Sequence, residues 1–167
     1  LPYADASFDV VLSTIGVMFC PYQEKAAAEL LRVCRPGGKI GLANWTPDGF
    51  TGRMLKTVGK HVPPPPGIKP PSLWGTEERL EELLGEGVSS LKVTRRTYTF
   101  RYPSPDHFVG WFREYYGPTV RAFAALDTEG QDALAGDLKE LCESRNVSGD
   151  DTLVVPSDYL EAVAVRS

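Results

Sequence analysis

The stretch that decides the fold begins with Phe8-Asp9-Val10-Val11-Leu12-Ser13, a short apolar run rich in β-branched residues. Such a run predicts a strand buried on both faces, as in a parallel sheet. Residues Gln23–Cys34 then place apolar side chains on one helical face, and Arg35-Pro36-Gly37-Gly38 supplies a stop and a turn. A second strand, Lys39–Asn44, follows. The order strand, helix, turn, strand predicts two adjacent parallel strands joined by a right-handed crossover.

Downstream of this unit the pattern alternates between helix and strand. The proline-rich residues 62–71 predict an extended connector, and a proline-motif ligand for a partner is the less common use of such a segment. The other elements that we expect before the last helices are helix Thr51–His61, helix Thr76–Leu84 and strand Leu91–Tyr102.

Helical signals dominate the region before the last predicted strand. Ser104-Pro105 and Pro118 each open a helix, and Thr128 with Gln131 three residues later matches a capping box for a helix that runs to about Glu143. Residues Tyr159–Val165 form the final strand. We therefore expect one α/β domain over residues 1–167, with a helical insertion between its last two strands.

Composition narrows the class of protein. The chain has 167 residues, is 42% hydrophobic and carries a formal net charge of −4, which is ordinary for a soluble globular protein and gives no basic footprint for nucleic acid. No apolar run is long enough to span a membrane, and residues 1–5 do not resemble a signal peptide. The three widely spaced cysteines predict free thiols in the cytoplasm, and the two histidines follow no metal-ligand spacing.

Two motifs resemble those of a known family. Leu1-Pro2-Tyr3 followed by Ser7-Phe8-Asp9-Val10-Val11 is similar to the "LPF...sFDvV" signature of ubiquinone/menaquinone-type class I S-adenosylmethionine (SAM)-dependent methyltransferases, and Glu29–Gly38 is similar to their "E..RVL.PGG" segment. The resemblance implies a Rossmann-like sheet of which this chain holds strands four to seven, with the last strand inserted antiparallel. The glycine-rich cofactor loop and the ribose-binding acid of the family have no match here, so we expect an incomplete fold.

The candidate site lies at the carboxyl ends of the two parallel strands, where open α/β sheets bind ligands. The resemblance implies that Leu1 lies near the adenine of SAM and that Ser13, Thr14, Ile15 and Gly16 lie near its methionine end. Met18, Phe19 and Trp45 would then wall the substrate side. Two alternatives stay open: Gly16 only relieves a tight loop, and the aromatic residues only pack in the core.

The implied function is methyl transfer to a small molecule. This reaction is an in-line displacement on an activated donor, so alignment supplies most of the rate and no catalytic residue is identified. The alternatives are a non-catalytic small-ligand-binding domain and an inactive fragment. We expect the chain alone to bind SAM weakly or not at all. We also expect the open edge of strand Phe8–Ser13 to recruit a second copy and form a homodimer.

Overall fold

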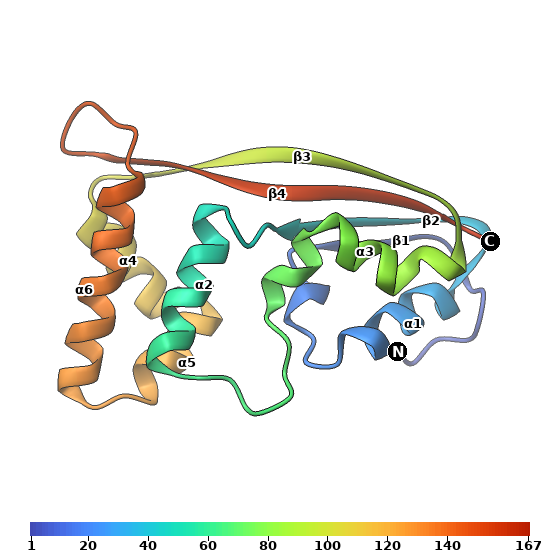
Figure 1. Cartoon of the computed structure of the whole chain (residues 1–167), viewed down its shortest axis with the longest axis horizontal. Helices are drawn as coiled ribbons and strands as arrows, with labels where there is room; N and C mark the ends of the chain where they lie inside the picture. Colours follow the sequence, from blue (N-terminus) through green and yellow to red (C-terminus); the bar gives the residue numbers. More distant parts are fainter. The chain divides into compact units, whose positions relative to one another are not determined.

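A computed structural model describes residues 1–167 and contains one mixed sheet of four strands in the order β1-β2-β4-β3. Figure 1 labels these elements along the chain. No helix has the length and apolar character needed to cross a membrane. The elements are β1 (Phe8–Thr14), η1 (Val17–Phe19), α1 (Gln23–Val33), β2 (Cys34–Trp45), α2 (Phe50–His61), η2 (Pro71–Gly75), α3 (Glu77–Leu84), η3 (Gly85–Gly87), β3 (Val88–Tyr102), α4 (Pro105–Tyr115), α5 (Gly117–Ala124), α6 (Thr128–Arg145) and β4 (Leu153–Arg166).

The chain divides into two compact units, each described here by itself. The sheet unit comprises Leu1–Pro47, Gly67–Arg96 and Asp158–Ser167. The helical unit comprises Asp48–Pro66 and Thr97–Ser157. Each of the strands β3 and β4 contributes residues to both units.

The predicted β-α-β arrangement is confirmed in the sheet unit. Strands β1 and β2 are parallel neighbours, with Val11 opposite Ile40 and Thr14 opposite Ala43. The predicted turn is an excursion at the start of β2, where the register shifts and Gly37 has a φ of +74°. Glycine suits this position because it adopts a positive φ without a Cβ clash. Strand β2 then pairs antiparallel with β4, as the family resemblance implied for the last strand.

The expectation that β1 is buried on both faces is wrong. Val10 is 52% exposed and Leu12 is 74% exposed, whereas Val11 on the other face is half-buried. The physical reason is the position of β1 at the edge of the sheet, where α1 packs against it on one face only. In Figure 1, α1 and α3 lie on the same side of β1 and β2. The edge position itself agrees with the predicted open edge.

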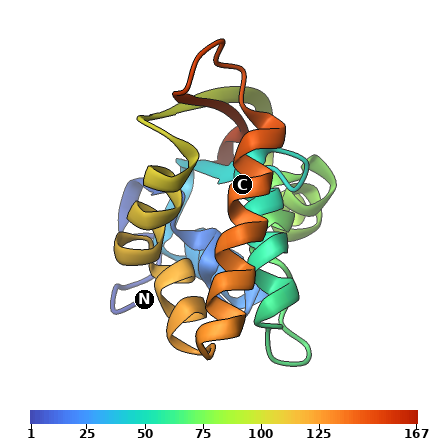
Figure 2. The same ribbon diagram turned by 90° about the vertical axis from the view of Figure 1, so that its left-hand side faces the viewer.

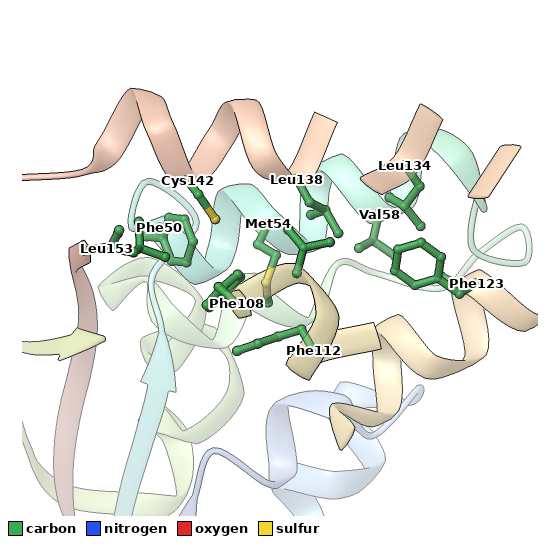
Figure 3. Close-up of a cluster of buried hydrophobic side chains, with 13 residues drawn as sticks. Phe50, Met54, Val58, Phe108, Phe112, Phe123, Leu134, Leu138, Cys142 and Leu153 are labelled. Carbon is green, nitrogen blue, oxygen red and sulfur yellow. The ribbon is translucent and has the colours of Figure 1, made fainter. Parts of the chain in front are cut away.

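The helical unit encloses its own apolar core. Figure 2 shows α6 lying alongside α2, and these two helices contact each other and α5. Figure 3 shows side chains of these helices and of α4 converging between them. The buried cluster consists of Phe50, Met54, Val58, Phe108, Val109, Phe112, Ala122, Phe123, Leu134, Leu138, Cys142, Leu153 and Val155. Helices α4, α5 and α6 lie between β3 and β4 in the sequence, so the predicted helical insertion is confirmed.

Two boundary predictions in this unit need correction. Strand β4 begins at Leu153, six residues before the predicted Tyr159, because Leu153 and Val155 are drawn into the helical core. The cap of α6 is Asp127, whose side chain accepts a hydrogen bond from the Gly130 amide at 2.9 Å. Thr128 is already the first helical residue, and Gln131 donates to the carbonyl oxygen of Leu126 at 3.0 Å. The capping box at Thr128 is therefore wrong by one residue.

Candidate functional site

The carboxyl ends of β1 and β2 meet at a strained loop. The Ile15 amide donates to the carbonyl oxygen of Ala43 at 2.8 Å, which ties the end of β1 to β2. Ile15 has a φ of +54°, a left-handed conformation that is rare for a β-branched residue. The Val17 amide then donates to the Ser13 hydroxyl at 2.8 Å, and this contact starts η1. Strain held in place by surrounding contacts is a common feature of functional sites.

Gly16 does not carry the unusual dihedral of this loop. Its φ is −114°, a value open to any residue. A Cβ added at Gly16 would lie 3.3 Å from the Ser13 Oγ, so the loop is tight at this point. Thr14 and Gly16 are exposed, while Ser13 and Ile15 are partly buried. The loop therefore offers two exposed residues, and Ser13 is occupied with positioning η1.

A hollow of about 360 Å³ lies next to this loop. Leu1 and Val17 line it together with Cys20, Lys25 and Leu30, so it is bounded by the N-terminal segment, η1 and α1. Its volume is in the range of small-molecule sites. The structure thus brings the predicted residue Leu1 to the segment that directly follows the predicted loop Ser13–Gly16.

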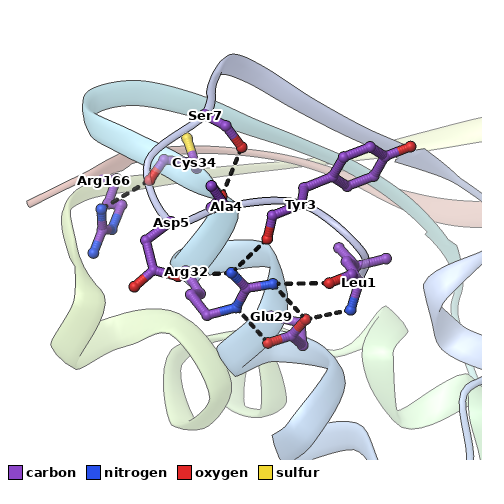
Figure 4. A network of polar contacts seen from close by, with 9 residues as sticks. All are labelled: Leu1, Tyr3, Ala4, Asp5, Ser7, Glu29, Arg32, Cys34 and Arg166. Carbon is purple, nitrogen blue, oxygen red and sulfur yellow. Dashed lines mark hydrogen bonds and ion pairs between the residues drawn. The ribbon is translucent and has the colours of Figure 1, made fainter.

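Arg32 of α1 holds the N-terminal segment beside this hollow (Figure 4). Its guanidinium donates to the carbonyl oxygens of Tyr3 at 2.8 Å and Leu1 at 3.1 Å, and to the carboxylate of Asp5 at 2.7 Å. The same guanidinium binds Glu29, and Arg32 followed by the N-terminal amine lowers the pKa of Glu29 to about 2. This network fixes where Leu1 lies relative to α1.

The three residues expected to wall the substrate side lie in different environments. Met18 is 1% exposed and Trp45 is 8% exposed, and the Trp45 ring packs edge-on against Tyr159 with centroids 5.9 Å apart. Phe19 is 36% exposed. Burial of Met18 and Trp45 supports the core-packing alternative for these two, while Phe19 is the one that reaches the surface.

Sequence reasoning missed two buried polar side chains in this region. Asn44 is 0% exposed, and neither its Oδ1 nor its Nδ2 has a hydrogen-bond partner. The indole Nε1 of Trp74 is likewise buried without a partner. A signal was present for Asn44, since it follows Ile40 and Leu42 at alternate positions of β2 and so occupies the buried face. Trp74 gave no comparable signal.

The side chains that could ligate a metal do not gather into a cluster. No group of three or more His, Cys, Asp or Glu side chains is positioned to hold a metal ion. His61 of the helical unit contacts the carboxylate of Asp137 at 2.8 Å, which links α2 to α6. The aromatic side chains from Trp111 to Tyr116 form ring contacts within the helical unit.

Comparison with known proteins gives a family match over the first quarter of the chain. Residues 1–42 match the model of a methyltransferase domain. Over this segment the chain is similar to the class I SAM-dependent methyltransferases. The resemblance in the two sequence motifs is thereby confirmed, and the α/β methyltransferase fold with its mixed sheet agrees with it.

Individual relatives extend beyond this chain. Uncharacterized protein Rv1405c of Mycobacterium tuberculosis is 48% identical over 128 residues, which are 75% of this chain and 47% of that protein. The demethylmenaquinone methyltransferase of Renibacterium salmoninarum is 44% identical over 50 residues, 30% of this chain and 21% of that protein. The solved structure of a candidate methyltransferase from Bacillus halodurans C-125 has a TM-score of 0.54 at 15% identity, covering 98% of this chain and 66% of that chain. The chain spans about half the length of the first of these relatives.

Proposed function

We propose that this chain is part of a SAM-dependent methyltransferase that transfers a methyl group to a small molecule. One observation carries the proposal: the segment with the methyltransferase motifs folds into β1-α1-β2 and brings Leu1 and Val17 to one hollow at the carboxyl end of β1. Ligands of open α/β sheets bind at this end.

The residues present fit one side of a SAM site. The hollow is lined by the apolar residues Leu1, Val17 and Leu30 and by the charged Lys25 and Glu29, a mixture that suits an adenosyl group with polar edges. We assign Leu1 and the loop Ser13–Gly16 to the cofactor, which supplies an activated methyl group when bound. The loop residues would orient the bound molecule, and Met18, Phe19 and Trp45 would limit the space on the substrate side.

The strand order supports our further proposal that the sheet corresponds to strands four to seven of the family fold. Strand β4 lies between β2 and β3 and runs antiparallel to β2. This is the arrangement expected if β4 is the inserted seventh strand. Because the 167 residues contain no glycine-rich cofactor loop, we propose that they bind SAM weakly and have no activity alone. The three unpaired cysteines support a reducing cytoplasmic setting.

The exposed edge supports a homodimer. Val10 and Leu12 lie on β1 with no neighbouring strand on their outer side. Exposed edge strands recruit other strands, and self-complementary pairing closes as a two-fold dimer. We therefore propose that two copies associate through β1.

Cys20 gives a direct test of the cofactor site, because it is exposed and lines the hollow. Cys34 and Cys142 are buried, and burial raises the pKa of both thiols, that of Cys142 to about 12. Iodoacetamide at neutral pH should therefore label Cys20 selectively, which a Cys20→Ser variant would verify. Millimolar S-adenosylhomocysteine should slow the labelling, whereas methionine at the same concentration should not.

Two results would count against these proposals. Equal labelling rates with and without millimolar S-adenosylhomocysteine would remove the cofactor site from this hollow. Full protection at low micromolar concentration would contradict weak binding by the chain alone. Each hydrogen bond lost from a binding site weakens affinity by about three- to tenfold. The missing contacts therefore place the expected dissociation constant for SAM well above the micromolar range.

A further inference from the structure

Asn44 occupies an unusual position for a carboxamide. It is fully buried near the end of β2, on the face that also buries Ile40 and Leu42. The residue paired with it on the adjacent strand β4 is Leu160, which is 3% exposed. A buried carboxamide without partners costs free energy, and native proteins keep few such groups without a role.

Trp74 places a second unpartnered group in the same region. It belongs to η2, which contacts both β2 and η1 in the sheet unit. The next residue, Gly75, lies so close to β2 that an added Cβ would be 2.1 Å from the Trp45 carbonyl oxygen. The backbone of η2 next to Trp74 is thus held against the carboxyl end of β2, at the residue that follows Asn44.

The surroundings of these two groups carry further marks of a functional site. The strained Ile15 is hydrogen-bonded to Ala43, the residue immediately before Asn44. Ile15 lies just before the 3-10 helix η1, and Trp74 lies within the 3-10 helix η2. Strain, orphaned polar atoms and irregular helix therefore coincide at one end of the sheet.

The hydrogen-bonding capacity of the two side chains selects a ligand chemistry. Asn44 offers one acceptor oxygen and an N–H donor group, and Trp74 offers one donor only. A carboxylate would leave the acceptor of Asn44 unpaired, and an ammonium group would leave both donors unpaired. A hydroxyl accepts two hydrogen bonds and donates one, so it satisfies all three groups at once.

We propose that Asn44 and Trp74 form a subsite for a hydroxyl group of the small-molecule substrate. The hydroxyl donates to Oδ1 of Asn44 and accepts from Nδ2 of Asn44 and from Nε1 of Trp74. This assignment rests on the proposed methyltransferase function for the identity of the bound molecule as a substrate, and it narrows that substrate to an alcohol or a phenol. A water molecule has the same capacity and is the competing occupant.

Nuclear magnetic resonance of the 167-residue chain tests the subsite without SAM. The chain has three tryptophans, so its three indole N–H signals can be assigned by single Trp→Phe variants. Phenol, titrated to millimolar concentration, should shift the Trp74 indole signal and the Asn44 carboxamide signals. Toluene, which keeps the ring and replaces the hydroxyl with a methyl group, should not. The signal of Trp111, exposed on α4 of the helical unit, is the internal control.

Two variants test the contributions of Asn44 and Trp74 to phenol binding one at a time. Asn44→Ala should weaken the phenol response at Trp74 by about three- to tenfold, the effect of losing one neutral hydrogen-bonding partner. Trp74→Phe keeps a ring in the core and removes the N–H, and it should weaken the response at Asn44 by a similar factor. Since each change removes polar atoms that have no partner within the protein, both variants are expected to fold.

Three outcomes would overturn the subsite. Equal shifts with phenol and toluene would mean that the region responds to the ring. No shift with either probe, together with a persistent water signal at Trp74, would mean that an ordered water alone satisfies the groups. A phenol response unchanged in both variants would place the binding elsewhere. None of these outcomes affects Cys20 protection by S-adenosylhomocysteine, so failure of the subsite and failure of the proposed function are distinguishable.

Discussion

The guanidinium of Arg79 in α3 lies 2.6 Å from the carboxylate of Glu24 in α1, and it also donates to the buried side-chain oxygen of Gln23 at 3.0 Å. These contacts join the two helices that cover the sheet unit. Gln23 in turn donates to the carbonyl oxygen of Pro70 at 3.1 Å, so the same network holds the chain just before η2.

Arg79→Ala should therefore lower the free energy of unfolding by about 2 kcal/mol, through the unsatisfied Gln23 oxygen and the lost packing of the arginine stem. Lys69→Ala is the matched control, because the Lys69 amine binds the same Glu24 oxygen at 2.6 Å but is half exposed. It should lower stability by much less than Arg79→Ala does. Urea unfolding of both variants decides the matter, and equal effects would show that the network contributes only as surface ion pairs.

The stability of the chain should fall in acid through Glu24. Hydrogen bonds from Lys69 and Arg79 lower the pKa of Glu24 from 4.5 to about 2. A carboxyl whose pKa is lower in the folded state stabilises the fold fully above the unfolded value, and this contribution disappears as the pH falls from 4.5 to 2. The Glu24→Gln variant should show a flatter decline of the urea midpoint over this range. Glu81→Gln, exposed on α3, should keep the parent profile.

The cap of α6 gives a local test of the structure. Asp127→Ala should cost about 1 kcal/mol, because it leaves the Gly130 amide without its acceptor. Thr128→Ala should cost much less, since Thr128 is inside the helix. Thermal unfolding of the two variants distinguishes the capping residues. The reverse order of effects would restore the capping box centred on Thr128.

This correction shows where sequence reasoning reaches its limit. The β1-α1-β2 unit was predictable because strand and helix periods differ and glycines mark the turn between them. The choice between Asp127 and Thr128 was not, because both residues cap helices well and only backbone geometry decides. The exposure of Leu12 was also hidden, because an apolar strand does not say which of its faces is covered. The role of Asn44 depends on missing partners, which a sequence cannot show.

The bare edge of β1 predicts the behaviour of surface variants. Leu12 is 74% exposed, so Leu12→Lys should leave the fold intact. The new charge lies on the proposed dimer contact and should prevent edge-to-edge pairing. The parent chain should scatter light as a dimer and the variant as a monomer. Val147→Lys, at a 65% exposed position in the helical unit, should remain dimeric. A monomeric parent chain would exclude association through β1.

Gly75 should be the least replaceable glycine of the sheet unit. A methyl group at this position would lie 2.1 Å from the carbonyl oxygen of Trp45 and 2.7 Å from the Cα of Thr46, and both are backbone atoms that cannot rotate away. Gly75→Ala must therefore move η2 away from β2, and we expect a loss of at least about 3 kcal/mol in the free energy of unfolding.

Gly59 provides the opposite case in α2. A Cβ there meets no atom within 4 Å, and alanine favours the helix by about 0.5–1 kcal/mol over glycine. Gly59→Ala should therefore raise the midpoint of urea unfolding, whereas Gly75→Ala should lower it and broaden the Trp74 indole signal. A Gly75→Ala chain as stable as the parent would show that η2 is not held against β2, and the assignment of Asn44 and Trp74 to one subsite would then lose its structural basis.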